Sequence, residues 1–342
     1  MNKTLVFVIP FGALPNYIFP AAAWAKKLME KGYRIVWIKC NQAMDSTCVV
    51  HYTLKVEDKK ANRHRICSWC RSYQNSVLEE LGCDGYVLNP VDDSELLDFD
   101  LDLKKLSAYT LMFSYKCLSL EELEQKYPEE LSRYEKMNRV LLTQFERLKS
   151  KIDFTNSQII VFHSMYPYAA ALGAWARQEG FAYLSFNLGY SLAHLNTSVS
   201  VTRSDIETST MQLARYYEKN WKKLSYSPED ISRSLLHLES GLFKKDVKNY
   251  SLAKSGNLVS VADQLGLGTD KKFVILACGS SNDEIAGSEV VRESCFGSSP
   301  DSVFADQISW FKALVERYSH RDDVILILRP HPRELKYQDG GH

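Results

Sequence analysis

Short apolar runs of strand length recur along the chain and alternate with stretches whose apolar residues repeat at helical spacing. The runs cover residues 5–9, 34–39, 158–162, 182–186, 272–278 and 324–329. Uninterrupted apolar runs of this length are typical of parallel strands that are buried on both faces. Strands that alternate with helices predict an α/β fold built on parallel sheets.

The first unit of this kind joins the runs at 5–9 and 34–39 through a helix. Asn16 is placed to cap this helix at its start, and Gly32 is placed to end it. The turn after the first strand lacks the G-x-G-x-x-G pattern, which argues against a dinucleotide site. A sugar or acceptor site and a turn that only connects two elements both remain open. Further helices are predicted over 118–152, with a break at Pro128, and over 168–179.

A strand, helix, strand unit is predicted near the carboxyl terminus. Residues 302–319 have helical periodicity and lie between the apolar runs at 272–278 and 324–329. In open α/β sheets, ligands bind beyond the carboxyl ends of the strands. We therefore expect the polar and charged residues at these two strand ends to form a functional site. They are Ser280, Ser281, Asn282, Glu284, Arg329 and His331.

Three segments of this unit resemble a known family. They are Gly-Ser-Ser-Asn-Asp-Glu at 279–284, Asp-Gln-Ile-Ser-Trp at 306–310 and Arg-Pro-His-Pro-Arg-Glu at 329–334. In this order they resemble the carboxyl domain of bacterial capsular-polysaccharide and lipopolysaccharide glycosyltransferases with the GT-B architecture, and most of all the capsule enzymes that transfer Kdo. The Arg-x-His-Pro loop is the moderately specific part of the match, and the remainder is a match of pattern and order.

The resemblance implies two Rossmann-like domains that transfer a sugar from a nucleotide-activated donor to a growing surface polysaccharide. Residues 1–250 would form the amino-terminal acceptor domain, with a cysteine-containing insertion at 40–70 and a helical connector. Residues 251–342 would form the first part of the donor domain. The implied partners are a nucleotide sugar and a saccharide or lipid-linked saccharide, with no cofactor required for catalysis. Because the sequence ends soon after the His-Pro loop, we expect an incomplete donor domain and poor or no transfer by this chain alone.

Glycosyl transfer requires a base or a support for positive charge, and neutralisation of the departing phosphate. His331 lies between two prolines that restrict its backbone, and we assign it to the leaving phosphate as a catalytic residue. Glu284 is the second catalytic candidate, as a base or as the partner of His331. Guanidinium groups bind oxyanions at two points, and loop hydroxyls and amides can form an anion nest. The residues assigned to donor binding are Ser280, Ser281, Asn282, Arg329 and Arg333.

A purely structural role is the alternative for this loop. A histidine at a strand end is commonly structural, and Arg329 could form an ion pair with Glu334 instead of binding a phosphate. The resemblance favours the functional interpretation of His331.

Acceptor binding is assigned to loops of the amino-terminal domain, which face the cleft between the domains in the family. The residues at these strand ends are Asn16, His163 and Asn187. The family usually has an Asn-Gly-Arg-like turn where this chain has His163-Ser-Met. The Ser/Thr-rich segment 188–205 is predicted to be a long loop beside the same cleft.

Four cysteines in or beside the insertion are candidates for a metal site: Cys40, Cys48, Cys67 and Cys70. In Cys67-Ser-Trp-Cys70 the spacing lets two thiolates converge on one tetrahedral zinc ion, whereas the spacing of Cys40 and Cys48 is longer than usual. A structural zinc, unpaired or transiently oxidised thiols, and a redox pair all remain open. A disulfide is less expected in a reducing cytoplasm.

Composition limits the classes of function. The chain has 342 residues, which is enough for two domains, and its 42 Lys and Arg residues balance 42 Asp and Glu residues. No basic field therefore points to nucleic acid. The first apolar run is broken at Pro10, and no apolar run reaches about 18 residues, so neither a signal peptide nor a transmembrane helix is predicted. We expect a cytoplasmic protein that can associate peripherally with the inner face of the membrane.

Two other functions fit the same sequence. A nucleotide-sugar epimerase or hydrolase on the same double-Rossmann fold would act without an acceptor. A non-catalytic sugar- or nucleotide-binding module with a cysteine-bound zinc would not depend on His331.

Overall fold

The fold is known from a computed structural model. It describes residues 3–53, 60–188, 199–202, 219–220, 223, 227–229, 232, 273–278, 282–296, 304 and 307–329. The predicted domain boundary near residue 250 lies outside these residues, and so does the predicted helical connector, apart from isolated positions.

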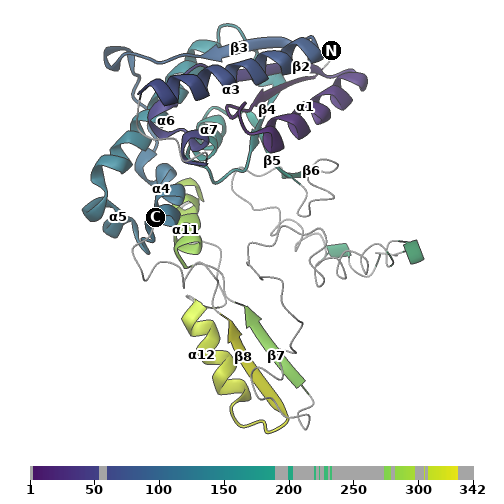
Figure 1. Ribbon diagram of the computed structural model, residues 1–342, viewed down its shortest axis with the longest axis vertical. Helices are drawn as coiled ribbons and strands as arrows, with labels where there is room; N and C mark the ends of the chain where they lie inside the picture. The colour runs from purple at the N-terminus through teal and green to yellow at the C-terminus, as the bar shows by residue number, and fades with distance from the viewer. Residues whose placement is uncertain are drawn as a thin grey trace.

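A six-stranded sheet forms the amino-terminal part of the chain (Figure 1). Its strands in spatial order are β3 (Asp84–Leu88), β2 (Arg34–Cys40), β1 (Thr4–Val8), β4 (Ser157–Phe162), β5 (Ala182–Leu188) and β6 (Val199–Thr202). The first five are parallel, and β6 runs antiparallel to β5. This order is that of a Rossmann-like sheet. The predicted α/β class with a parallel sheet is confirmed.

Helices cover both faces of this sheet. The helices of the amino-terminal part are α1 (Pro15–Glu30), α2 (Val49–Thr53), α3 (Lys60–Leu81), α4 (Leu103–Tyr115), α5 (Leu120–Lys126), α6 (Pro128–Leu148) and α7 (Pro167–Gln178). Short 3-10 turns are η1 (Asp45–Thr47), η2 (Asp93–Glu95) and η3 (Phe154–Asn156). Successive side chains of β1 point to opposite faces of the sheet. Phe7 therefore packs with α1 and α3 on one face, whereas Val6 packs with α4, α6 and α7 on the other.

Local sequence explains several helix boundaries. Pro128 ends the pattern of α5 and begins α6, where a proline is tolerated because the first helical N–H has no partner. Asp102 accepts a hydrogen bond from the N–H of Lys105 and so caps α4. The prediction that Asn16 caps the first helix is wrong, because Pro15 begins α1 and Leu14 occupies the capping position without a side-chain hydrogen bond.

A second, two-stranded sheet lies in the carboxyl-terminal part. Strands β7 (Phe273–Cys278) and β8 (Val324–Arg329) are parallel, with Cys278 opposite Arg329. Helix α12 (Gln307–Tyr318) precedes β8 and contains most of the helical pattern at 302–319. The predicted strand, helix, strand unit is therefore confirmed, with one helix more than the sequence indicated.

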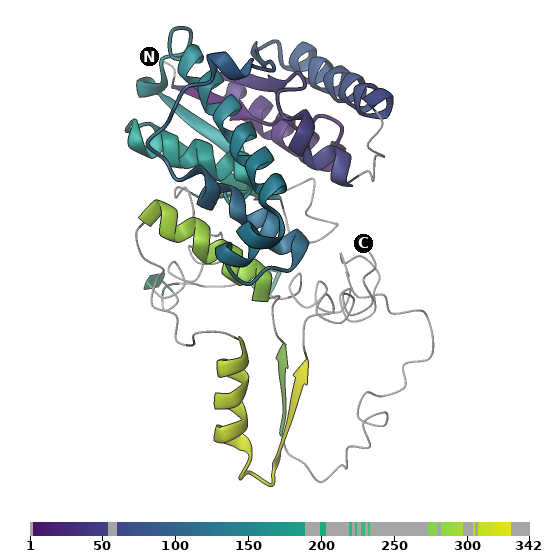
Figure 2. The ribbon, with the colours of Figure 1, turned by 90° about the vertical axis from the view of Figure 1, so that its left-hand side faces the viewer.

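The additional helix is α11 (Asn282–Phe296), which packs against α4 of the amino-terminal part in both views (Figure 2). Residues 282–284 were predicted as part of a loop, and this is wrong, since Asn282 and Glu284 belong to the first turn of α11. A Cβ atom on Gly287 would lie 3.1 Å from Cα of Tyr109. Glycine therefore allows the close approach of the two helices.

Two further observations concern the remaining segments. Strand β6 lies within the segment 188–205 that was predicted as a loop, because Val199 and Val201 pair with β5. Within the described residues, no helix is both long enough and apolar enough to cross a membrane.

Candidate functional site

The carboxyl edge of the six-stranded sheet is the position at which this fold binds ligands. Strands β1 and β4 are neighbours, and the chain continues from them to opposite sides of the sheet. Such a reversal of strand order leaves a crevice at the carboxyl ends of the two strands. The segments that start there are residues 10–14 after β1 and residues 163–166 after β4.

His163 has a strained backbone at this edge. Its φ of 53° lies in the left-handed region, which costs free energy for a residue with a side chain. The turn is fixed on both sides, because the N–H of His163 donates to the carbonyl of Phe186 at 3.0 Å and its carbonyl accepts from the N–H of Tyr166 at 3.2 Å. The imidazole stacks on the ring of Tyr166, with 4.6 Å between centroids. The half-buried ring is thus held in one place at the crevice.

The other two predicted acceptor residues have different settings. Asn16 is exposed in the first turn of α1. Asn187 is half-buried within β5 and pairs with Ser200 of β6, so it belongs to a strand and not to a loop. All three residues belong to segments that begin or end near the carboxyl edge, and their joint action on one acceptor stays a prediction.

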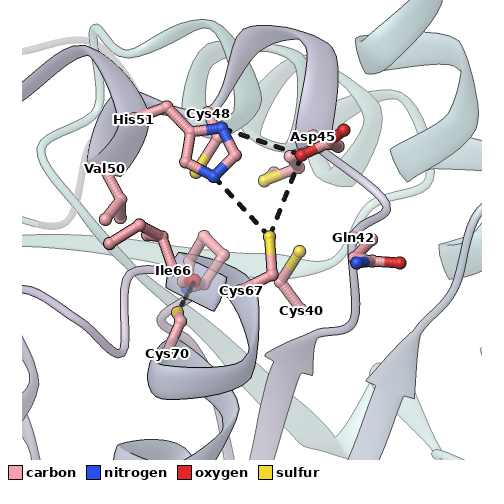
Figure 3. A pocket seen from close by; sticks show the side chains of 11 residues that line it. Cys40, Gln42, Asp45, Cys48, Val50, His51, Ile66, Cys67 and Cys70 are labelled. Carbon is pink, nitrogen blue, oxygen red and sulfur yellow. Dashed lines mark hydrogen bonds and ion pairs between the residues drawn. The ribbon is translucent and has the colours of Figure 1, made fainter. Parts of the chain in front are cut away.

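A second group of polar side chains and thiols lies in a small cavity next to this edge (Figure 3). The cavity has a volume of about 20 Å³ and is lined by Pro10, Cys40, Gln42, Met44, Asp45, Cys48, Val50, His51, Ile66, Cys67 and Cys70. The Sγ of Cys67 lies 3.6 Å from Nε2 of His51 and 3.8 Å from Oδ1 of Asp45. The Nδ1 of His51 lies 3.7 Å from the same Asp45 oxygen.

Three elements bring these side chains together. Asp45 begins η1, His51 lies on α2, and Cys67 lies on α3, one turn before Cys70. All four predicted cysteines line the cavity, but the thiol of Cys70 donates to the carbonyl of Pro10 at 3.6 Å and takes no part in the group formed by Cys67, His51 and Asp45 (Figure 3).

Burial controls the charge in this cavity. It raises the pKa of the Cys67 thiol to about 12, and the neighbouring Cys48 adds to this shift. Burial likewise raises the pKa of Cys40 to about 12 and that of Cys48 to about 11. It lowers the pKa of His51, although Asp45 acts in the opposite direction. At neutral pH, without a bound cation, the thiols are protonated and the imidazole is neutral.

Two other hollows are present in the described part of the chain. One of about 40 Å³ shares Met44 and Cys48 with the first cavity and is otherwise mostly apolar and aromatic. It is much smaller than a sugar site, since ligand pockets have volumes of roughly 300–1,000 Å³. The other, of about 460 Å³, lies on the surface beside α6, where Lys136 pairs with Asp93 at 2.6 Å and Arg139 with Asp98 at 3.3 Å. Mutually paired surface charges give no indication of a ligand.

The predicted donor-side residues are described only in part. Ser280, Ser281, His331 and Arg333 lie outside the described residues. Asn282 and Glu284 are in the first turn of α11, and Arg329 ends β8. The predicted roles of these residues stay predictions.

Sequence reasoning missed Asp45 and His51. A signal for His51 was present, because Cys48-Val-Val-His51 has the same spacing as Cys67-Ser-Trp-Cys70. The two pairs are separated by about 15 residues, which is typical of paired zinc-binding motifs. The carboxylate of Asp45 had no such signal, since its approach to Cys67 depends on how η1 packs against α3.

In comparisons with known proteins, no family model and no curated protein matches the chain. Among solved structures, it is similar to one described as the glycotransferase of kitacinnamycin, with 9% sequence identity and a TM-score of 0.27. The likeness covers 96% of this chain and 65% of that chain, so this chain spans less than two thirds of the length of the protein that it matches. At this TM-score the likeness is too distant to transfer a function.

Proposed function

We propose that the chain is a glycosyltransferase of GT-B type, which transfers a sugar from a nucleotide-activated donor to a growing surface polysaccharide of capsule or lipopolysaccharide. The main support is the parallel pairing of β7 and β8, in which Cys278 lies opposite Arg329. Both strands therefore end at the same level, and the segments that follow them start from neighbouring points at one sheet edge. These segments carry the Ser280-Ser281 pair and the His-Pro loop that resembles the glycosyltransferase family.

The proposed chemistry follows from the residue types in these segments. Arg329 and Arg333 bind the donor phosphates, because a guanidinium group offers two parallel N–H donors to an oxyanion. His331 donates to the phosphate that leaves with the nucleotide, and Glu284 is the second catalytic candidate. Neutralising the departing phosphate lowers the barrier to cleavage of the bond between the anomeric carbon and the phosphate oxygen. The acceptor hydroxyl oxygen then forms the new bond to that carbon, and its proton passes to a base.

The acceptor side of the proposal rests on the first sheet. His163 is held at the crevice between β1 and β4 by backbone hydrogen bonds and a stacked ring. An imidazole in this position can accept a hydrogen bond from a sugar hydroxyl. The acceptor is a saccharide or a lipid-linked saccharide.

Nucleotide binding tests this function. Isothermal titration with CMP, UDP, GDP and dTDP should show binding of one base, and His331→Ala and Arg333→Ala should each weaken it at least tenfold. Arg321→Ala is the matched control, since Arg321 lies on the exposed turn before β8 and pairs with Asp323 at 2.5 Å. Nucleotide binding that neither substitution changes would refute the proposed donor site at the His-Pro loop. Product analysis with the matching nucleotide sugar then separates transfer from hydrolysis or epimerisation.

A further inference from the structure

We propose that the cavity between η1, α2 and α3 binds one Zn²⁺ ion, with Cys67, His51 and Asp45 as three ligands and the thiol of Cys48 or Cys40 as the fourth. This ligand set differs from the four cysteines that the sequence indicated. His51 and Asp45 take the places of Cys70, whose thiol donates to Pro10, and of one of Cys40 and Cys48.

The spacing of the three groups is that of a tetrahedral zinc site. Bond lengths of about 2.3 Å to sulfur and about 2.0–2.2 Å to nitrogen and oxygen place neighbouring ligand atoms about 3.5 Å apart. The observed separations are 3.6 Å from Cys67 to His51 and 3.8 Å from Cys67 to Asp45. One ligand atom from each of the three residues lies within 4.8 Å of the others. Small side-chain rotations therefore complete the site.

His51 supplies an independent indication of a ligand. The residue is only 7% exposed, yet its Nδ1 has no hydrogen-bond partner within the described part of the chain. The 3.7 Å to Asp45 is too long for a hydrogen bond. A buried polar atom without a partner costs about 1–3 kcal/mol. An ion bound to Nδ1, between His51 and Asp45, would give this nitrogen a partner and remove the cost.

The cavity also selects the kind of ligand. A volume of about 20 Å³ accommodates a single water-sized sphere, which excludes a sugar or a nucleotide. A mixture of thiol, imidazole and carboxylate suits zinc, whereas calcium and magnesium prefer oxygen ligands.

The ion would join segments that carry the sheet edge. Asp45 and His51 follow β2, whereas Cys67 lies on α3. The same helix contacts the loop after β1, because Gln74 and Cys70 both donate to the carbonyl of Pro10, at 3.0 and 3.6 Å. A zinc ion would therefore fix α3 and, through it, the start of the loop that borders the crevice.

Metal content tests the proposal directly. The full chain, purified under reducing conditions and equilibrated with Zn²⁺, should retain one zinc ion per chain after gel filtration, as measured by plasma mass spectrometry. We expect Cys67→Ser and His51→Ala to reduce zinc affinity at least tenfold in a chelator competition. Cys70→Ser and Cys83→Ser should retain the ion, and Cys83 is a matched control because it lies outside the cavity.

Cobalt substitution gives a second readout that needs no variant. The wild-type chain with Co²⁺ should show the intense visible bands of tetrahedral coordination and a sulfur-to-cobalt charge-transfer band of two thiolates. A chain that retains no zinc, or an octahedral cobalt spectrum, overturns the proposal. Loss of zinc in Cys70→Ser with retention in His51→Ala overturns this ligand set in favour of four cysteines.

Discussion

The carboxylate of Asp283 on α11 lies 2.7 Å from the ammonium of Lys116, which caps the carboxyl end of α4. The side chain of Asp283 is 2% exposed and that of Lys116 is 22% exposed. The second oxygen of Asp283, Oδ1, has no hydrogen-bond partner within the described residues. The lysine is therefore the main compensation for a buried charge, and it connects two helices that are far apart in the sequence.

Replacing Lys116 by methionine should destabilise the chain by about 2–4 kcal/mol, because removal of one partner leaves a buried charge uncompensated. The loss should appear as a lower urea midpoint of unfolding. The double variant Lys116→Met with Asp283→Leu should regain most of it, since the charge is then absent as well.

Lys105→Ala is the control for this pair. Lys105 lies 3.5 Å from Glu293, whose side chain is 58% exposed, and exposed pairs contribute less than about 1 kcal/mol. Equal losses in Lys105→Ala and Lys116→Met would show that the burial of Asp283 is unimportant.

Gly287 should be the least replaceable residue of α11. A Cβ atom there would lie 3.1 Å from Cα and 3.2 Å from the carbonyl oxygen of Tyr109, and backbone atoms cannot rotate away. Gly287→Ala should therefore cost about 1–3 kcal/mol despite the higher helix propensity of alanine. Glu289→Ala on the same helix should change the urea midpoint little. A stabilised Gly287→Ala would mean that α11 does not pack against α4.

The sequence predicted the strands well because their signal is local. Buried parallel strands are continuous apolar runs, and the runs at 158–162 and 324–329 coincide with β4 and β8 to within a residue. Helix α11 was missed because its start, Asn-Asp-Glu, has the composition of a loop, and its contact with α4 depends on Gly287.

In the candidate sites, too, the sequence predicted local patterns but not contacts between distant segments. The cysteines could be identified from spacing, and they do line one cavity. Asp45 and His51 enter that cavity only because η1 and α2 fold back onto α3, and no periodicity in the sequence encodes this contact. The strained turn at His163 was located correctly at a strand end, but its left-handed backbone could not be read from His-Ser-Met.

Comparison of two His163 variants should separate backbone strain from chemistry. Glycine tolerates a φ of 53°, whereas alanine pays a cost of about 1 kcal/mol there. His163→Gly should thus unfold at a higher temperature than His163→Ala, although both lose the ring stacked on Tyr166. If the imidazole contacts the acceptor, both variants should raise the acceptor KM by a similar factor. If the acceptor KM instead rises only in the variant with the lower unfolding temperature, His163 has a structural role only.

A side chain at Gly12, in the loop after β1, should disturb the proposed zinc site by displacing α3. A Cβ atom on Gly12 would overlap the backbone carbonyl of Cys70 and lie 2.6 Å from Cγ of Gln74. Gly12→Ala must therefore push the loop and α3 apart, and we expect a loss of about 2 kcal/mol or more together with weaker zinc binding. Gly85→Ala is the matched control, because its Cβ would meet only the side chain of Leu78, at 2.7 Å, which can change rotamer. Urea unfolding and chelator competition on both variants measure the two effects. Gly12 is not itself a ligand of the proposed ion. Weaker zinc binding in Gly12→Ala, with unchanged binding in Gly85→Ala, would therefore show that the position of α3 depends on the loop after β1. Unchanged zinc binding in both variants would show that the zinc site is independent of this loop.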